Sequence, residues 1–268
     1  MLVSIIIAGV QKAGTTSLSS YLSEHPRLLS SARKELHFFD DDEMNWTSPN
    51  SAPYHANFAA DQTKQIAFEA TPIYCFWPES MARMHAYNPC MRLILIFRDP
   101  IERAWSHWCM EYAREREDLP FAEAIRQGRQ RMMAFEPSGR LRRTFSYVER
   151  GLYARQVSRA LQLFSRRQLL FLRSSDLADE PGRVLHQVAA FLGVEPFPLI
   201  RARREGARPE HPYPSELTNG DIRHLRRIYL PEIERFALLT GLRVDDWLTC
   251  RAEAGEVAHR GGAGHPGG

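Results

Sequence analysis

The alternation of apolar and polar positions along the chain predicts strands that alternate with helices. Short apolar runs bounded by turn residues predict buried strands at 3–8, 66–70, 92–97 and 168–172. Apolar residues that recur at three- and four-residue spacing predict helices up to residue 25, from Pro100 onward, and at 151–164, 181–192 and 215–239. Because this alternation builds parallel sheets, we expect an α/β fold with a central parallel sheet flanked by helices.

The length of 268 residues suits one large α/β domain. We expect a single domain over 1–250 and a low-complexity, disordered tail over 251–268. Two further segments, 40–64 and 134–147, are polar and contain proline. We therefore expect both to be loops that border a substrate cleft.

The charged residues exclude some classes of partner. The formal net charge is only +3 and acids are interspersed with bases, so we expect no nucleic-acid-binding surface. Only Lys12, Lys34 and Lys64 are lysines among 35 basic residues, a bias that a GC-rich genome explains. The region 126–183 holds 13 arginines, three of them in one predicted loop at 140–143. These arginines fit either solvated helix faces or contact with an anionic acceptor.

Cysteine usage and the amino-terminal segment bear on the compartment. The four cysteines form no CxxC pair and no dense framework, which predicts small buried side chains in a reducing compartment without structural zinc. The apolar run from Leu2 to Val10 is too short to span a membrane and lacks the flanks of a signal peptide. We therefore expect a cytoplasmic protein without membrane insertion.

The segment Gly9–Thr16 follows a predicted strand and opens a predicted helix. In this context backbone N–H groups and the helix N-terminus converge on an anion, which predicts a P-loop-type phosphate site. Gly9, Gly14 and Thr16 fit the ATPase pattern G-x-x-x-x-G-K-[ST], but Thr15 stands where that pattern has lysine, and the lysine is Lys12 instead. Lys12 suits the bridging oxygen next to a 5′-phosphate better than a γ-phosphate.

A second anion-binding segment is predicted where the third strand ends. Arg98 lies at the carboxyl end of a buried strand, where open α/β sheets bind ligands, and Ser106 lies two turns into the following helix. The guanidinium and the hydroxyl can together bind a second phosphate. Asp99, between Arg98 and Pro100, is a poor candidate for a magnesium-binding acid.

Five sets of residues, in this order along the chain, resemble the sulfotransferases that use 3′-phosphoadenosine 5′-phosphosulfate (PAPS), in particular the heparan sulfate sulfotransferase branch and its bacterial relatives. They are Lys12–Thr16, Lys34–Asp40, Phe68–Tyr74, Arg98–Ser106, and Gly151–Tyr153 with Phe191–Gly193. The resemblance covers roughly residues 3–200 and implies the sulfotransferase fold.

The resemblance also implies an activity and a set of site residues. It implies a PAPS-dependent O-sulfotransferase, without a metal requirement, that acts on a hydroxyl of a glycan, glycolipid or secondary metabolite. Lys12 would stabilise the leaving phosphate and Glu35 would be the general base, with His37 orienting the reactants and Asp40 holding His37. The implied cofactor-binding residues are Lys12, Ala13, Gly14, Thr15, Thr16, Ser17, Arg98, Ser106, Tyr153 and Arg208.

Departures from the family pattern keep alternatives open. Heparan-modifying members carry lysine where this chain has Ala70, which argues against a heavily sulfated acceptor. The family's loop over the cofactor has no clear counterpart, and Arg208 is its nearest candidate. One alternative is a P-loop kinase or ATPase, which the threonine at position 15 disfavours. The other is a non-catalytic relative with a nucleotide-binding or scaffolding role, which the presence of both Lys12 and Glu35 disfavours.

Overall fold

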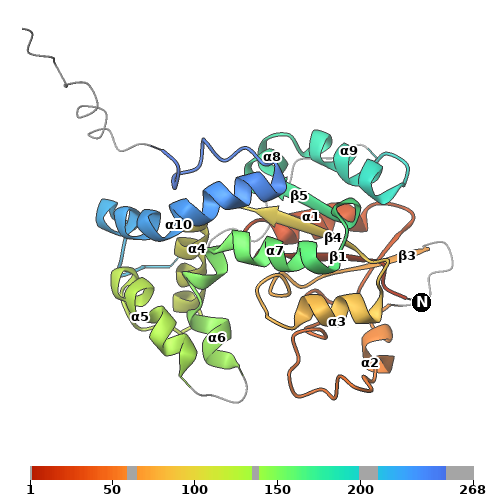
Figure 1. The fold of residues 1–268 in the computed structure, drawn as a ribbon, viewed down its shortest axis with the longest axis horizontal. Coiled ribbons are helices and arrows are strands. Elements are labelled where there is room, and N and C mark those ends of the chain that lie inside the picture. Colours follow the sequence, from red (N-terminus) through yellow and green to blue (C-terminus); the bar gives the residue numbers. More distant parts are fainter. Residues whose placement is uncertain (1, 59–64, 135–138, 199–210, 252–268) are drawn as a thin grey trace, which may run out of the picture.

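The computed structural model describes residues 2–58, 65–134, 139–198 and 211–251, and a parallel sheet forms its centre (Figure 1). Within these residues the sheet has five strands in the order β2–β3–β1–β4–β5, and every pairing is parallel. The strands are β1 Ile5–Gly9, β2 Leu28–Ser30, β3 Ile66–Ala70, β4 Arg92–Phe97 and β5 Leu169–Arg173. The predicted α/β class is therefore confirmed.

The four predicted strands are all present, and those at 66–70 and 92–97 have the predicted bounds. Strand β2 was not predicted. It has only three residues and lies at the edge of the sheet, beside β3, so neither length nor alternation marks it in the sequence.

Helices connect the strands and cover both faces of the sheet (Figure 1). The longer ones are α1 Thr15–Ser23, α3 Ser80–Tyr87, α4 Pro100–Ala113, α5 Phe121–Met133, α7 Tyr153–Leu163, α9 Pro181–Leu192 and α10 Asn219–Thr240. The shorter ones are α2 Ala52–His55, α6 Arg140–Phe145 and α8 Ser174–Asp179, with single 3₁₀ turns at Glu149–Gly151 and Arg166–Gln168. No helix among the described residues is long and apolar enough to cross a membrane.

Two expectations about loops need correction. The segment 134–147, predicted to be a loop, contains helix α6, and the basic residues at 140, 142 and 143 lie on that helix. Gly139 begins it with a φ of 65°, a conformation that glycine adopts without strain. The segment 40–64 contains the single turn α2. The predicted tail over 252–268 and Lys64 lie outside the described residues.

The order of the strands fixes where a ligand can bind. The chain leaves β1 toward β2 on one side and leaves β4 toward β5 on the other, so β1 and β4 flank the point where the topology reverses. Ligands of open α/β sheets bind at the carboxyl ends of the two strands that flank such a point. The loops that follow β1 and β4 contain the two segments predicted to bind phosphate.

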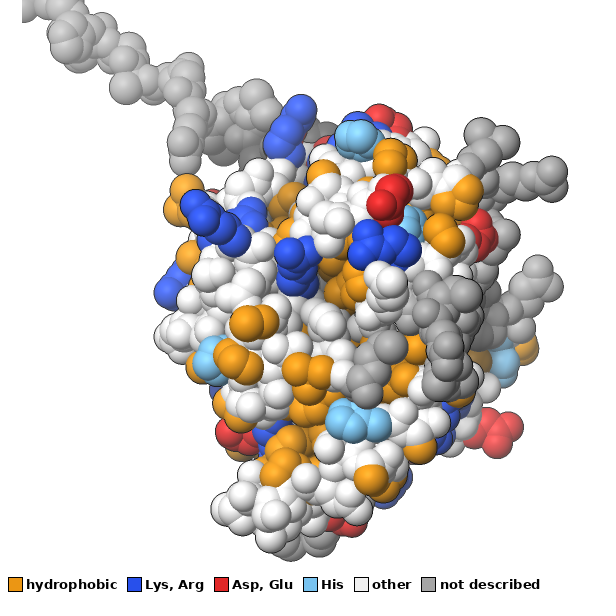
Figure 2. Space-filling view, turned by 90° about the vertical axis from the view of Figure 1, so that its right-hand side faces the viewer, with side chains coloured by type: hydrophobic (Ala, Val, Ile, Leu, Met, Phe, Trp, Pro, Cys, Tyr) orange, Lys and Arg blue, Asp and Glu red, His pale blue; other side chains and the backbone are white. Residues whose placement is uncertain are grey.

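Figure 2 shows the side of the molecule on which the chain begins. Basic, acidic and apolar side chains lie beside one another on this face. This mixture is what the nearly balanced charge of the sequence predicts for a surface that is not specialised for a polyanion.

Candidate active site

The loop between β1 and α1 is shaped by two glycines. A Cβ on Gly9 would lie 2.6 Å from the Cβ of Cys75, so only glycine allows this close approach. Gly14 has a φ of 94° and forms the N-cap of α1, where it has no side chain to pair with the first N–H groups of the helix. The positive end of the helix dipole therefore lies at this loop, where the motif predicts that an anion binds.

Lys12 lies at the top of this loop, half-buried, with a φ of 70°. Burial and the positive charges of Arg114 and Arg98 lower the pKa of Lys12 below its usual value, and Glu35 opposes this shift. Three cations thus converge at the carboxyl edge of the sheet. A ligand that carries several negative charges would relieve their mutual repulsion, so the electrostatics favour a polyanionic ligand here.

Arg98 follows β4, and its Nε donates to the Glu102 carboxylate at 2.9 Å. The backbone beneath it is fixed, because the buried Tyr153 hydroxyl donates to the Arg98 carbonyl at 2.9 Å. This contact supports the strand end that carries Arg98, and the predicted role of Tyr153 in binding the cofactor stays a prediction. Ser106 lies half-buried on α4, and its part in binding stays a prediction.

Asp99 is fully engaged by the protein. One of its carboxylate oxygens accepts the N–H groups of Ile101 and Glu102, each at 2.9 Å, and so caps α4. The other accepts the N–H of Thr249 at 2.8 Å and its hydroxyl at 2.7 Å. A carboxylate occupied in this way is a poor partner for nucleotide-bound magnesium, which disfavours the ATPase alternative.

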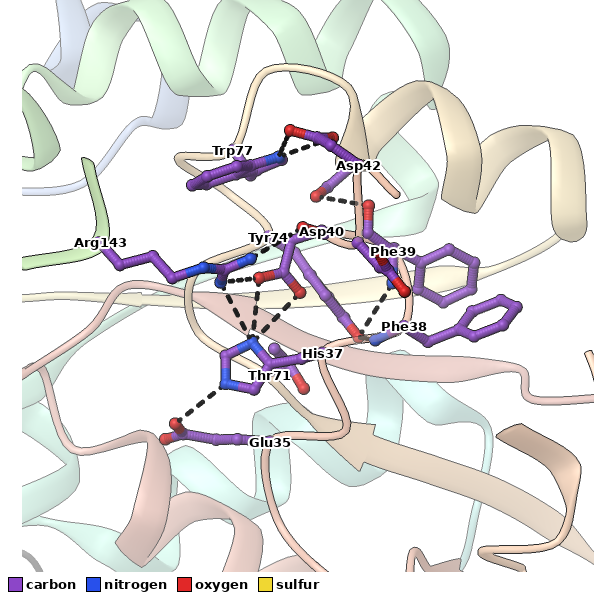
Figure 3. A network of polar contacts seen from close by, with 12 residues as sticks. Glu35, His37, Phe38, Phe39, Asp40, Asp42, Thr71, Tyr74, Trp77 and Arg143 are labelled. Carbon is purple, nitrogen blue, oxygen red and sulfur yellow. Dashed lines mark hydrogen bonds and ion pairs between the residues drawn. The ribbon is translucent and has the colours of Figure 1, made fainter. Parts of the chain in front are cut away.

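The segment that follows β2 brings the predicted base and its partners together (Figure 3). His37 Nδ1 lies 2.9 Å from Asp40 Oδ2, and His37 Nε2 lies 3.8 Å from Glu35 Oε2. Lys34 Nζ donates to the other Glu35 oxygen at 2.9 Å. Asp40 has no exposed surface, whereas the Glu35 side chain is 43% exposed and open to a reactant.

The orientation of the His37 ring follows from its partner Asp40. Burial by itself would raise the pKa of Asp40, but the hydrogen bond with His37 and the charges of His37 and Arg143 lower this pKa overall. Asp40 is therefore ionised and accepts the proton on Nδ1, which turns Nε2 of the ring toward Glu35. This arrangement is suited to orienting a hydroxyl group beside Glu35.

Backbone strain is concentrated in the same residues. Among the described residues, the non-glycine positions with positive φ are Lys12, Glu35, His37 and Glu115. Such conformations cost roughly 1–3 kcal/mol each and persist where the surroundings enforce them, which is common at functional sites. Three of the four predicted catalytic residues, Lys12, Glu35 and His37, therefore have strained backbone conformations that contacts with the surrounding structure must stabilise.

Arg143 on α6 closes the site from the opposite side, 103 residues further along the chain. Its guanidinium donates to the Asp40 carboxylate and, at 2.9 Å, to the Asp40 carbonyl, and it packs 4.5 Å from the centre of the Trp77 ring. Beside these groups lies a cavity of about 240 Å³. Its lining residues are His37, Asp40, Asp41, Asp42, Glu43, Trp77, Gly139 and Arg143.

Glu69, near the end of β3, is a buried carboxylate behind the segment that contains Glu35 and His37. It accepts hydrogen bonds from Tyr54 (3.0 Å), Thr71 (2.6 Å) and Tyr74 (3.1 Å). Complete burial raises the pKa of Glu69 from 4.5 to about 7, although the three hydrogen bonds oppose the rise. The folded chain thus binds this proton more tightly than the unfolded chain does.

We therefore expect Glu69 to make stability depend on pH. Its contribution is fully present below about pH 4.5 and is lost as the pH rises through 7, a change of about 3 kcal/mol in the free energy of unfolding. In Glu69→Gln this group no longer titrates, so between pH 5 and 8 the free energy of unfolding should fall less steeply than in the wild type. Urea unfolding at a series of pH values measures both slopes, and equal slopes would contradict the assignment.

The structure brings together most of the residues predicted for the site. Lys12, Glu35, His37 and Asp40 lie around one edge of the sheet, and Thr15, Thr16 and Ser17 form the first turn of α1, directly after Ala13 and Gly14. Arg208 lies outside the described residues. Of the cysteines, Cys75 and Cys109 are buried as expected, but Cys90 is exposed and Cys250 is half-buried, so that expectation was wrong for two of the four.

The sequence analysis assigned no role to Arg143, Trp77, Glu69 and Arg150. Arg150 is buried and donates to the side chain of Gln11 at 2.6 Å and to the carbonyl of Arg143 at 2.8 Å, which links the loop after β1 to α6. The cluster of arginines around Arg143 was noticed, but nothing local in the sequence indicates that one of them pairs with Asp40.

Comparison with known proteins identifies the family. The family model described as a sulfotransferase domain matches residues 3–201, so the chain belongs to the sulfotransferase family. It is 28% identical over 262 residues to heparan sulfate glucosamine 3-O-sulfotransferase 3B1 of Homo sapiens, a match that covers 88% of this chain and 63% of the relative. It is 29% identical over 263 residues to the Homo sapiens 3-O-sulfotransferase 6, covering 88% and 71%.

A solved structure gives the same assignment. The sulfotransferase from Alicyclobacillus acidocaldarius superposes with a TM-score of 0.76 at 27% identity, covering 91% of this chain and 98% of that one. The resemblance to sulfotransferases and the predicted fold are thereby confirmed. This chain spans 63% of the length of the 3B1 relative.

Proposed function

We propose that the protein is a PAPS-dependent O-sulfotransferase. The observation that carries this proposal is the convergence of Lys12, Arg98 and Arg114 with an uncapped helix N-terminus, next to the Glu35–His37–Asp40 arrangement. The first group of residues suits a polyanionic donor, and the second suits the activation of a hydroxyl group. A kinase would need magnesium-bound phosphates, for which Asp99 is not available.

In the proposed reaction the hydroxyl oxygen of the acceptor forms a bond to sulfur while the bond from sulfur to the 5′-phosphate oxygen breaks. Glu35 accepts the proton from the hydroxyl group, and His37 orients that group with Asp40 as its support. Lys12 stabilises the negative charge that develops on the leaving phosphate oxygen. The first turn of α1 and Arg98 with Ser106 hold the two phosphate groups of the donor.

We propose that the cavity beside His37 receives the acceptor, and its charge bears on the class of acceptor. Four of its lining residues are acids, and Asp40 already engages the guanidinium of Arg143. A polysulfated chain would meet like charges there, which costs several kcal/mol when the charges are desolvated. We therefore propose a neutral or amine-bearing hydroxyl acceptor, and we keep the prediction from cysteine usage that the enzyme is cytoplasmic.

Incubation with labelled PAPS tests the function and the acceptor class together. We expect label to appear in neutral or amine-bearing glycans, glycolipids or hydroxylated metabolites, with polysulfated saccharides at least about tenfold poorer because of charge repulsion. Glu43→Gln removes one exposed acid from the lining of the cavity. The rate with polysulfated saccharides should therefore come closer to the rate with neutral acceptors. Preference for the polysulfated chain would overturn the acceptor class. Binding of ATP with magnesium, but not of adenosine 3′,5′-bisphosphate, would overturn sulfotransfer itself.

A further inference from the structure

The backbone that carries Glu35 and His37 is held by side chains that follow β3. The N–H of Leu36 donates to the Thr71 hydroxyl at 3.0 Å, and the N–H of Phe38 donates to the Tyr74 hydroxyl at 3.0 Å. Both hydrogen bonds are buried. The two N–H groups belong to the residues directly before and after His37. Leu36 also lies between Glu35 and His37, the two residues of this segment with positive φ.

Glu69 determines which way these two hydroxyl groups point. A hydroxyl has one proton, and those of Thr71 and Tyr74 are donated to the Glu69 carboxylate at 2.6 and 3.1 Å. The lone pairs of the two oxygens are therefore left to accept the backbone N–H groups. Above about pH 7, where Glu69 is ionised, its carboxylate accepts hydrogen bonds only, so it cannot compete with the two hydroxyls as an acceptor for the backbone N–H groups.

We propose that Glu69 is a positioning residue for the transfer reaction, acting through Thr71 and Tyr74 to hold the strained Glu35–His37 segment in its reactive conformation. The inference rests on the proposed function, because the segment matters for catalysis only if Glu35 is the base. The hydrogen-bond partners of Glu69 are Tyr54, Thr71 and Tyr74, so its effect on Glu35 and His37 is transmitted by the hydroxyls of Thr71 and Tyr74. Strained residues persist only where the surroundings over-determine them, and this network supplies that constraint.

Tyr54 provides a matched control for this proposal. Its buried hydroxyl also donates to Glu69, at 3.0 Å, but it accepts no hydrogen bond from the 35–39 backbone. Tyr54→Phe and Tyr74→Phe therefore each remove one hydrogen bond to Glu69, and only Tyr74→Phe also removes an acceptor of that backbone. Thr71→Ser keeps the second bridging hydroxyl, whereas Thr71→Val removes it.

Turnover and amide hydrogen exchange are measured for the full chain and these four variants, at a temperature where each is folded. We expect Tyr74→Phe and Thr71→Val to lower kcat about 10- to 100-fold, since small displacements of catalytic groups have effects of this size. Tyr54→Phe and Thr71→Ser should stay within about threefold of the wild type, because both bridges survive. The affinity for adenosine 3′,5′-bisphosphate, measured by calorimetry, should be unchanged in all four.

Hydrogen exchange separates failure of this proposal from failure of the proposed function. Exchange of the amides in 36–39 should accelerate in Tyr74→Phe and Thr71→Val but not in the two matched controls. Equal exchange, or equal losses of kcat, in Tyr54→Phe and Tyr74→Phe would overturn the positioning role. If the wild type transfers no sulfuryl group to any acceptor while exchange follows the expected pattern, the sulfotransfer proposal fails. The hydrogen bonds of Glu69, Thr71 and Tyr74 would then hold the 36–39 backbone in place without a role in sulfuryl transfer.

Discussion

Replacement of Lys12 by alanine is expected to lower the rate of sulfuryl transfer by about 100- to 1,000-fold, or roughly 3–4 kcal/mol in activation free energy. The reason is that the leaving phosphate oxygen gains charge only as its bond to sulfur breaks, so the cation acts mainly on the transition state. Initial rates with labelled PAPS at saturating acceptor measure the effect. The free protein should lose no stability, because burial and the neighbouring Arg114 and Arg98 already disfavour the charged form of Lys12.

Two further variants keep this prediction specific. Lys12→Arg retains the charge but replaces a compact ammonium by a planar fork, so we expect only partial recovery of the rate. Arg183→Ala removes an exposed cation of α9 that pairs with Asp176 and Glu180, and its rate should be close to that of the wild type. Turnover of Lys12→Ala at the wild-type rate would exclude a role for this side chain in the chemical step.

Replacement of Glu35 by glutamine is expected to lower kcat by about 100- to 10,000-fold while the affinity for adenosine 3′,5′-bisphosphate is retained. The amide has nearly the shape of the carboxylate, but it cannot accept the proton of the acceptor hydroxyl. The contacts of Glu35 explain why turnover should change while nucleotide affinity does not. Glu35 pairs with Lys34 and faces His37, and it interacts with Lys12 only through longer-range electrostatics.

Calorimetry and single-turnover rates on the same protein preparation test this separation. Glu180→Gln, at an exposed residue of the α9 N-terminus, serves as the control for a lost surface carboxylate and should change neither quantity. A large loss of nucleotide affinity in Glu35→Gln would show that Glu35 belongs to the donor site. In that case His37, rather than Glu35, would be the next candidate for the base.

The sequence was most informative where function depends on local order. Strands β3 and β4 are short, mainly apolar runs between clear turn signals, so their bounds could be predicted. The loop after β1 could be interpreted because its glycines, its lysine and the following helix are consecutive. For the Glu35–His37–Asp40 segment the roles came from the family resemblance; the contact between His37 and Asp40 agrees with that hypothesis, and the catalytic roles stay predictions.

The parts that could not be predicted depend on contacts between distant segments. Arg143 meets Asp40 across 103 residues, and the hydroxyl of Tyr74 meets the N–H of Phe38 across 36. Neither pairing has a periodicity or a motif of its own, because it exists only once folding has brought the segments after β2 and β3 and helix α6 together. The burial of Glu69 could not be foreseen for the same reason, since a carboxylate at a strand end is ordinarily exposed.

The pairing of Asp99 with Thr249 joins the donor site to a segment 150 residues further along the chain. Asp99 follows Arg98 directly, so the residue predicted to bind the second phosphate is attached to a carboxylate whose second oxygen is satisfied only by Thr249. A chain shortened before this threonine would leave a buried carboxylate with only one of its two oxygens paired, next to Arg98. Thr249 lies outside residues 3–201, which the family model matches, yet it supports the strand end that carries Arg98, so we expect the smallest active unit to extend past α10.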